Sequence, residues 1–179
     1  MATIYIPEAL NIFVTDTGPD NGKHLKITDV TLPKLSEKTM EHHPGGGIGA
    51  IQIGGLGFDP LELGFRLVGV DPQSLAQFGL GGTGQVPYTI YGAIRDKQTG
   101  SAIELKATSW GRMVTIDSGT WKRGDAAEQT HQIREITMYT LYWNKVELYY
   151  YDFYNSTWRV NGVDQVRDVN TILRISGGP

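Results

Sequence analysis

The sequence contains no cysteine, and three other common signals are also missing from it. Without a thiol, the chain has no disulfide framework, no thiolate metal site and no cysteine nucleophile. The formal net charge is −3, whereas a domain that grips nucleic acid by its phosphates normally carries a basic excess. No apolar run approaches the roughly 20 residues of a membrane span, and the first residues lack the basic and apolar segments of a signal peptide. We therefore expect a soluble protein, made in the cytoplasm, with no membrane anchor.

Recognised catalytic and cofactor-binding motifs are absent as well. No serine lies in a GxSxG motif, and the glycine-rich run from Gly45 to Gly55 lacks the lysine of a phosphate-binding loop. The adjacent His42 and His43 would point to opposite faces of a strand, so they form a poor metal clamp. We therefore expect no cofactor, no metal and no enzymatic activity.

One mixed charge cluster leaves an alternative open. Asp117, Asp125 and Glu128 lie close in sequence to Lys122 and Arg123. Clusters of this kind usually form ion pairs that fix a loop. The alternative is a hydrolase that uses acids such as Asp117 and Glu128.

The residues that are present predict a mainly β protein with many turns. Glycine is abundant, at 23 of 179 residues, and the hydrophobic share of 40% is enough for a packed core. Large apolar residues alternate with small or polar ones from residue 61 to residue 68, which places Leu61, Leu63, Phe65 and Leu67 on one sheet face. Further strands are expected at residues 10–15, 24–32, 88–95, 102–110, 128–143 and 146–151, with turns at 16–22, 96–100, 117–125 and 144–145.

Two short helices are also expected. In the first, Asp71 is the N-cap, Pro72 lies in the first turn and Gly79 follows the end, so that Leu75 and Phe78 share a face. The second follows the Asn161–Gly162 turn. Its apolar residues at helical spacing are Val163, Val166, Val169 and Leu173.

Residues 40–58, called the arm from here on, combine flexibility with apolar character. Seven glycines lie between Gly45 and Gly57, yet the segment is too apolar for a free linker. An exposed apolar arm is a liability in a monomer, so we expect a neighbouring subunit to cover it. The alternative is a long hairpin folded onto its own core. The residues assigned to this contact are Met40, His42, His43, Pro44, Ile48, Ile51, Ile53, Leu56 and Phe58.

Aromatic residues are concentrated near the end of the chain. Nine of the eighteen lie between Tyr139 and Trp158. Neighbouring strand residues point to opposite faces, so these rings cannot all enter one core. Tyrosine and tryptophan are favoured at protein interfaces. We therefore favour an interface, with a monomeric carbohydrate-binding β-sandwich as the alternative.

Four motifs in this order resemble the major tail tube protein family of contractile-tailed phages and phage-tail-like bacteriocins. They are VTLPKL (30–35), GRMVTID (111–117), WKRGDAAE (121–128) and VNGVDQVRDVN (160–170). The resemblance extends from about residue 10 to residue 175, and the first and last motifs together are fairly specific. The whole chain, residues 1–179, is then one tail tube domain. The family-matched residues are Thr31, Leu32, Pro33, Arg112, Asp117, Trp121, Gly124, Asn161, Gly162 and Asp164.

The resemblance implies two packed antiparallel sheets in a β-barrel-like sandwich, with a short flanking helix and a long protruding hairpin. Homohexameric rings would stack into a tube, with the arm reaching the next ring. The implied partners are the tail sheath protein, baseplate or tube initiator and terminator proteins, and a tape-measure protein. DNA would pass through without specific binding. The protein would be part of the virion tail or a phage-tail-like particle, assembled in the host cytoplasm. A bacteriocin or injection system without DNA cargo is the alternative machine.

Three local roles follow from the same resemblance. Thr31, Leu32 and Pro33 are expected to shape the entry to the arm. Arg112 and Asp117 are expected to pair and hold the following loop. The remaining expectation is that Asn161, Gly162 and Asp164 form the turn before the C-terminal segment.

Overall fold

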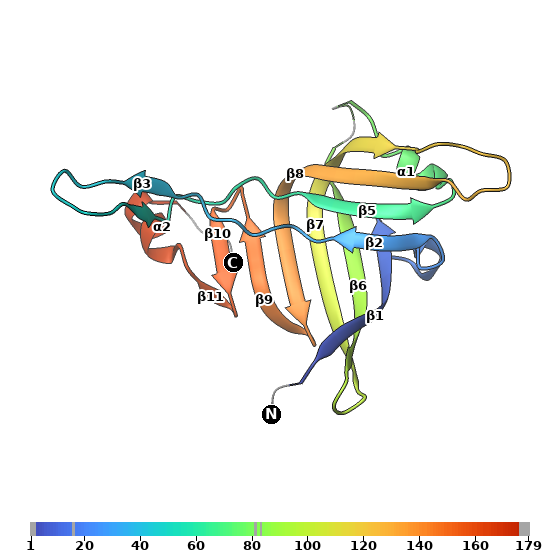
Figure 1. Ribbon diagram of the computed structural model, residues 1–179, viewed down its shortest axis with the longest axis horizontal. Coiled ribbons are helices and arrows are strands. Elements are labelled where there is room, and N and C mark those ends of the chain that lie inside the picture. Colours follow the sequence, from blue (N-terminus) through green and yellow to red (C-terminus); the bar gives the residue numbers. More distant parts are fainter. Residues whose placement is uncertain (1–2, 16, 81, 83, 176–179) are drawn as a thin grey trace.

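Most strands of the protein belong to one antiparallel sheet that folds over itself (Figure 1). The computed structural model describes residues 3–15, 17–80, 82 and 84–175. The strands of this sheet are β1 (Tyr5–Val14), β2 (Ile27–Thr31), β5 (Leu63–Val68), β6 (Val86–Asp96), β7 (Ala102–Asp117), β8 (Glu128–Trp143), β9 (Val146–Asp152), β10 (Thr157–Val160) and β11 (Val163–Asp164).

Two layers arise because β7 and β8 bend and contribute to both. The first half of β8 pairs with β5, and its second half pairs with β9. At the bend, Glu135 has a φ of 52° and the register shifts between Trp110 and Arg112. Gly111 permits β7 to approach β8 closely at this bend, since a Cβ at Gly111 would lie 2.7 Å from the Ile133 side chain. One layer is therefore β2–β5–β8–β7, and the other continues from β1 through β6, β7, β8 and β9 to β11.

The hydrophobic core lies between these layers. Leu63, Phe65 and Leu67 are almost completely buried, as the period-two pattern predicts. They pack with residues of the opposite layer, among them Ile12 and Tyr88. The predicted fold class, a mainly β protein with two packed antiparallel sheets, is confirmed.

The first helix is shorter than the sequence predicts. α1 comprises only Pro72–Leu75, and Asp71 caps it by accepting a hydrogen bond from the Ser74 amide at 3.0 Å. The predicted shared face of Leu75 and Phe78 is wrong, because the helix ends at Leu75 and the Phe78 side chain is 42% exposed. None of the helices in the described part of the chain has the length and apolar character needed to span a membrane.

The second helix, α2 (Arg167–Leu173), begins later than expected. Val163 lies in β11 instead, and the turn before it contains Asn161 and Gly162, whose φ angles are 50° and 78°. Left-handed angles at both positions are typical of a tight type I′ hairpin turn.

Several strand ends also differ from the expectation. β1 begins at Tyr5 rather than at residue 10. β2 begins at Ile27 rather than at residue 24, because residues 23–27 form a turn closed by the Ile27 amide and the Lys23 carbonyl. The predicted turn at 16–22 contains a short 3-10 helix, η1 (Pro19–Asn21), and its residue Asp16 lies outside the described residues. The 96–100 hairpin and the 144–145 turn are confirmed.

Candidate assembly site

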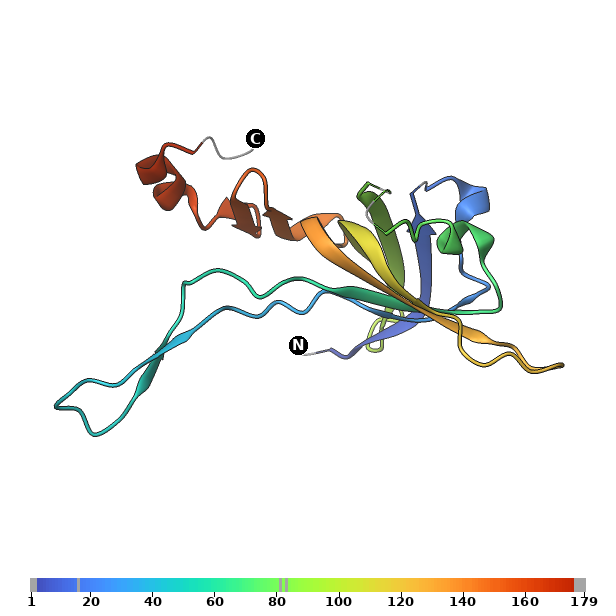
Figure 2. The same ribbon diagram turned by 90° about the horizontal axis from the view of Figure 1, so that it is seen from above.

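The arm projects from the two-layered body instead of folding onto it (Figure 2). Its outer part is a two-stranded hairpin of β3 (Met40–His42) and β4 (Ile51–Ile53), and every residue of both strands is exposed. Ile48 in the connecting segment is completely exposed. The alternative of a hairpin packed on its own core is therefore wrong. The projecting part of the arm presents the predicted residues Met40, His42, His43, Pro44, Ile48, Ile51, Ile53 and Leu56 to solvent.

Backbone hydrogen bonds hold the base of the arm together. The Lys38 amide donates to the Gly57 carbonyl at 2.8 Å, and the Asp59 amide donates to the Ser36 carbonyl at 2.9 Å. The Gly55 amide also donates to the Glu37 carboxylate. The structure places Thr31 at the end of β2 and Leu32 and Pro33 directly after it, at the entry to this base.

Phe58 anchors the arm within its own chain. Its ring lies edge-on to Trp158 at 4.7 Å and to Tyr151 at 6.1 Å between centroids. Trp158 also stacks on Tyr149 at 5.5 Å. Phe58 differs from the other residues assigned to the arm contact, because its ring is half-buried by aromatic residues of β9 and β10. Three of the clustered aromatic residues are thus used in internal packing rather than forming an open sugar-binding platform.

An apolar groove separates the base of the arm from the C-terminal segment. Its volume is about 460 Å³, and one wall carries Phe58 and Trp158. The other wall is α2 with the residues that flank it. The apolar residues of that wall are Val166, Val169, Leu173 and Ile175. Leu173 is 60% exposed although it is apolar, so this groove is open to solvent.

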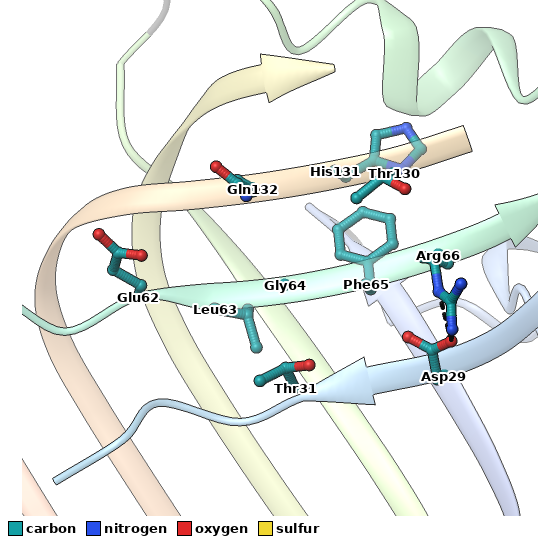
Figure 3. A pocket seen from close by; sticks show the side chains of 10 residues that line it. All are labelled: Asp29, Thr31, Glu62, Leu63, Gly64, Phe65, Arg66, Thr130, His131 and Gln132. Carbon is teal, nitrogen blue, oxygen red and sulfur yellow. Dashed lines mark hydrogen bonds and ion pairs between the residues drawn. The ribbon is translucent and has the colours of Figure 1, made fainter. Parts of the chain in front are cut away.

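The outward side chains of β2, β5 and the adjoining halves of β7 and β8 form a polar face. Figure 3 shows a hollow in it over Gly64, about 330 Å³ in volume. Arg66 pairs with Asp29 there, at 2.6 Å. The charged and polar side chains around the hollow are those of Asp29, Thr31, Glu62, Arg66, Thr130 and Gln132.

The other arginines of the polar face are also paired. Arg134 lies 3.0 Å from Glu62, and Arg112 lies 2.8 Å from Glu135. The predicted pairing of Arg112 with Asp117 is wrong, because Asp117 instead accepts a hydrogen bond from the Gly119 amide at 2.9 Å. Cross-strand geometry explains the difference, since the bend brings Glu135 of β8 beside Arg112 of β7.

The predicted charge cluster is not assembled as a catalytic pair. Glu128 lies 3.6 Å from Arg66 on the polar face, whereas Asp117 caps its own turn. In the loop that follows Asp117, Trp121 donates from its indole nitrogen to the Ser118 carbonyl, and Gly124 has a φ of 87°. Among the described residues, no group of three or more histidine and acidic side chains is placed to hold a metal ion.

A buried ion pair fixes α1 to the body of the protein. Asp71 lies 2.9 Å from Lys23 and 2.9 Å from Lys26, and it accepts hydrogen bonds from the Ser74 amide and hydroxyl. Burial alone would raise the pKa of Asp71, but the hydrogen bonds from Ser74 and the two lysines outweigh it and hold the pKa below its ordinary value.

His131 is the second buried titratable group. Its ring is fully buried and stacks on Phe65 at 4.5 Å. Burial lowers the pKa of His131 because the charged imidazolium would lose its hydration. Both buried groups therefore serve packing and stability.

The turn after β10 agrees with its expected role. Asn161 and Gly162 connect β10 to β11, and the Asp164 carboxylate accepts a hydrogen bond from the Val166 amide at 3.0 Å. This contact orients the chain as it enters α2. The matched motif at residues 160–170 thus builds one wall of the groove.

A mainly β subunit with a projecting apolar hairpin has the features of a protein that assembles with further copies. Residues 11–173 match the family model described as phage tail tube protein FII. The major tail tube protein of Serratia phage KSP20 is 30% identical over 159 residues, which cover 88% of this chain and 90% of that protein. The chain belongs to the phage tail tube protein family, as the motifs indicate.

Solved structures share the fold at low sequence identity. The cap of the anti-feeding prophage tube is similar with a TM-score of 0.55 and 12% identity, covering 79% of this chain and 94% of that one. A chain of the PVC sheath–tube complex, from an extracellular contractile injection system, is similar with a TM-score of 0.52 and 14% identity. That match covers 75% of this chain and 88% of the other. The protein is a tail tube subunit, and so a structural part of a tail particle.

Proposed function

We propose that this protein is the repeated, non-enzymatic subunit of the inner tube of a contractile phage tail. Its copies form hexameric rings that stack around a channel for DNA ejection. The observation that carries this proposal is the arm, which exposes Met40, Ile48 and Ile51 to solvent on a hairpin with no covering from its own chain. Apolar surface of this kind is expected to be covered in the working assembly.

Open sheet edges support ring formation. β1 is a terminal strand of the sheet, and its exposed residues include Tyr5 and Ile6. Pairing such an edge with a neighbouring copy removes its unpaired backbone groups. A head-to-tail contact that closes gives a ring, and a second one that does not close gives a stack.

The polar face is the surface that best suits the channel. Its carboxylates outnumber its arginines, and Arg66, Arg112 and Arg134 are each paired with a carboxylate of the same chain. Paired guanidinium groups have less capacity to hold DNA phosphates, so DNA would slide without sticking. Replacing Glu62 and Glu128 by lysine should slow DNA ejection while tubes still form. Unchanged ejection by such particles would remove the polar face from the channel.

Two of the remaining proposed partners, the sheath and the terminator, are supported by the solved structures of the same fold, and the others are proposed from the resemblance of the motifs. Chains of the same fold come from a sheath–tube complex and from a tube-terminating cap. The proposed partners are a contractile sheath around the tube, a terminator, a baseplate initiator and a tape-measure protein, with assembly in the host cytoplasm. The second candidate function is a tube without DNA cargo, which the likeness to an extracellular contractile injection system supports. Nucleic acid measured inside purified particles distinguishes the two machines.

Electron microscopy of the purified protein tests the proposal. The wild-type chain should give rings or tubes in negative stain when concentrated. A chain with Ile51→Asp and Ile53→Asp should keep its circular dichroism spectrum but form no tubes. Leu25→Asp is the matched control, because Leu25 is 88% exposed and lies outside the arm. Normal tubes from the arm variant, or a wild-type chain that stays a 19.8 kDa monomer, would refute the proposal.

A further inference from the structure

The groove beside α2 is an apolar surface without a role in the folded chain. Figure 2 shows the arm and the C-terminal segment leaving the body in the same general direction and diverging, so that a wedge opens between them. The groove lies between these two segments, with Phe58 and Trp158 on one side and α2 on the other. On α2, Val169 is 54% exposed and Ile172 is 79% exposed.

None of the described residues fills this groove, whose lining includes Phe58, Trp158 and Leu173. The projecting part of the arm leads away from it. The apolar side chains of the groove are therefore available to another molecule.

A second copy of the chain carries a surface of matching chemistry. Each copy has one projecting apolar hairpin and one open apolar groove, and a head-to-tail contact requires two such different, complementary surfaces. Charge contributes less than apolar character: Glu41 lies on β3 and Arg167 and Arg174 lie at the two ends of α2, whereas Asp168 on α2 and Asp152 in the groove lining are acidic.

We propose that the groove between Phe58 and α2 receives the arm hairpin of a neighbouring copy. Ile48 and Ile51 of the incoming arm then cover Val169 and Leu173. The incoming hairpin rests on the base of the resident arm, because Phe58 forms part of the groove wall. This inference depends on the proposed tube function and adds the receiving surface to it.

Cysteine cross-linking gives a direct test, because the natural chain has no cysteine. A double variant with Ile51→Cys and Val169→Cys is assembled, oxidised or treated with a short bis-maleimide, and separated on a denaturing gel. Each copy then donates one arm and receives another, so the monomer band should be lost to a ladder of multimers. Either single variant should stop at dimers. The matched control pair, Ile51→Cys with Leu25→Cys, should give no ladder.

The outcomes separate this inference from the proposed function. Tubes without a ladder, or an equal ladder from the control pair, would overturn the groove assignment and leave the tube function standing. A wild-type chain that forms no tubes would overturn both. If the cysteine variant does not assemble, Val169→Asp provides the second measurement: it should abolish tubes without changing the melting temperature, and normal tubes from it would overturn the groove assignment.

Discussion

Replacing Asp71 by asparagine should cause a large loss of stability, because the carboxylate is the centre of a buried network. Lys23 is only 6% exposed and lies 2.9 Å from Asp71, so its ammonium would lose its counter-charge and stay buried among neutral acceptors, Gln73 among them. Removing one partner of a buried ion pair costs about 3–5 kcal/mol. Lys26 is 43% exposed, and its share should be only about 0–1 kcal/mol. We therefore expect Asp71→Asn to lower the free energy of unfolding by about 3–5 kcal/mol.

Urea denaturation followed by tryptophan fluorescence measures this change. The pKa of Asp71 is lowered in the folded protein, so its stabilisation is present above the unfolded-state pKa of about 3.9 and is lost as pH falls below it. The wild-type chain should thus lose stability steeply below about pH 4, and the variant should lack this part of the slope. Asp125→Asn is the control, because Asp125 is exposed. A loss of unfolding free energy under about 1 kcal/mol would refute the stabilising role of the Asp71 network. A variant whose stability falls below pH 4 as steeply as that of the wild type would refute it as well.

Three further perturbations follow from the packing. Gly111→Ala should destabilise the protein by about 1–3 kcal/mol, because the new methyl group would lie 2.7 Å from Ile133; a melting curve unchanged from wild type would contradict the tight bend. Phe58→Ala should remove the half-buried contact with Trp158 and speed proteolysis of the arm, with cleavage at wild-type rate as the opposing result. Replacing His131 by phenylalanine should keep the aromatic stack on Phe65. Because the pKa of His131 is lower in the folded than in the unfolded chain, the wild-type protein should lose stability as pH falls below about 6.5, and the variant should lack this loss; chemical denaturation at pH 5.5 and 7.5 checks this.

Local sequence patterns were enough to predict much of the fold. Alternation at residues 61–68 identified the buried side of β5, and the turn residues Asn144 and Lys145 separated β8 from β9. The bend could not be predicted, because the pairing of each half of β8 with a different strand depends on contacts far away in sequence. The same reason explains Arg112, whose partner Glu135 lies on another strand.

The assembly site was predicted only in part. The excess of glycine and isoleucine identified the arm, because an apolar segment that cannot form a core element needs another explanation. The groove was missed, since its walls come from residues about 100 positions apart in the chain. A weak signal was present in Val166, Val169 and Leu173, whose helical spacing predicts one apolar face and leaves its partner unnamed.

The shared strands β7 and β8 have a mechanical consequence. Each is 16 residues long and passes without interruption from one layer into the other. Separating the layers would therefore require β7 and β8 to break backbone hydrogen bonds with their neighbouring strands, in addition to exposing the hydrophobic core. A tube that is pushed lengthwise against resistance is loaded in shear. A subunit whose two layers are connected by continuous backbone can transmit that load without the layers separating.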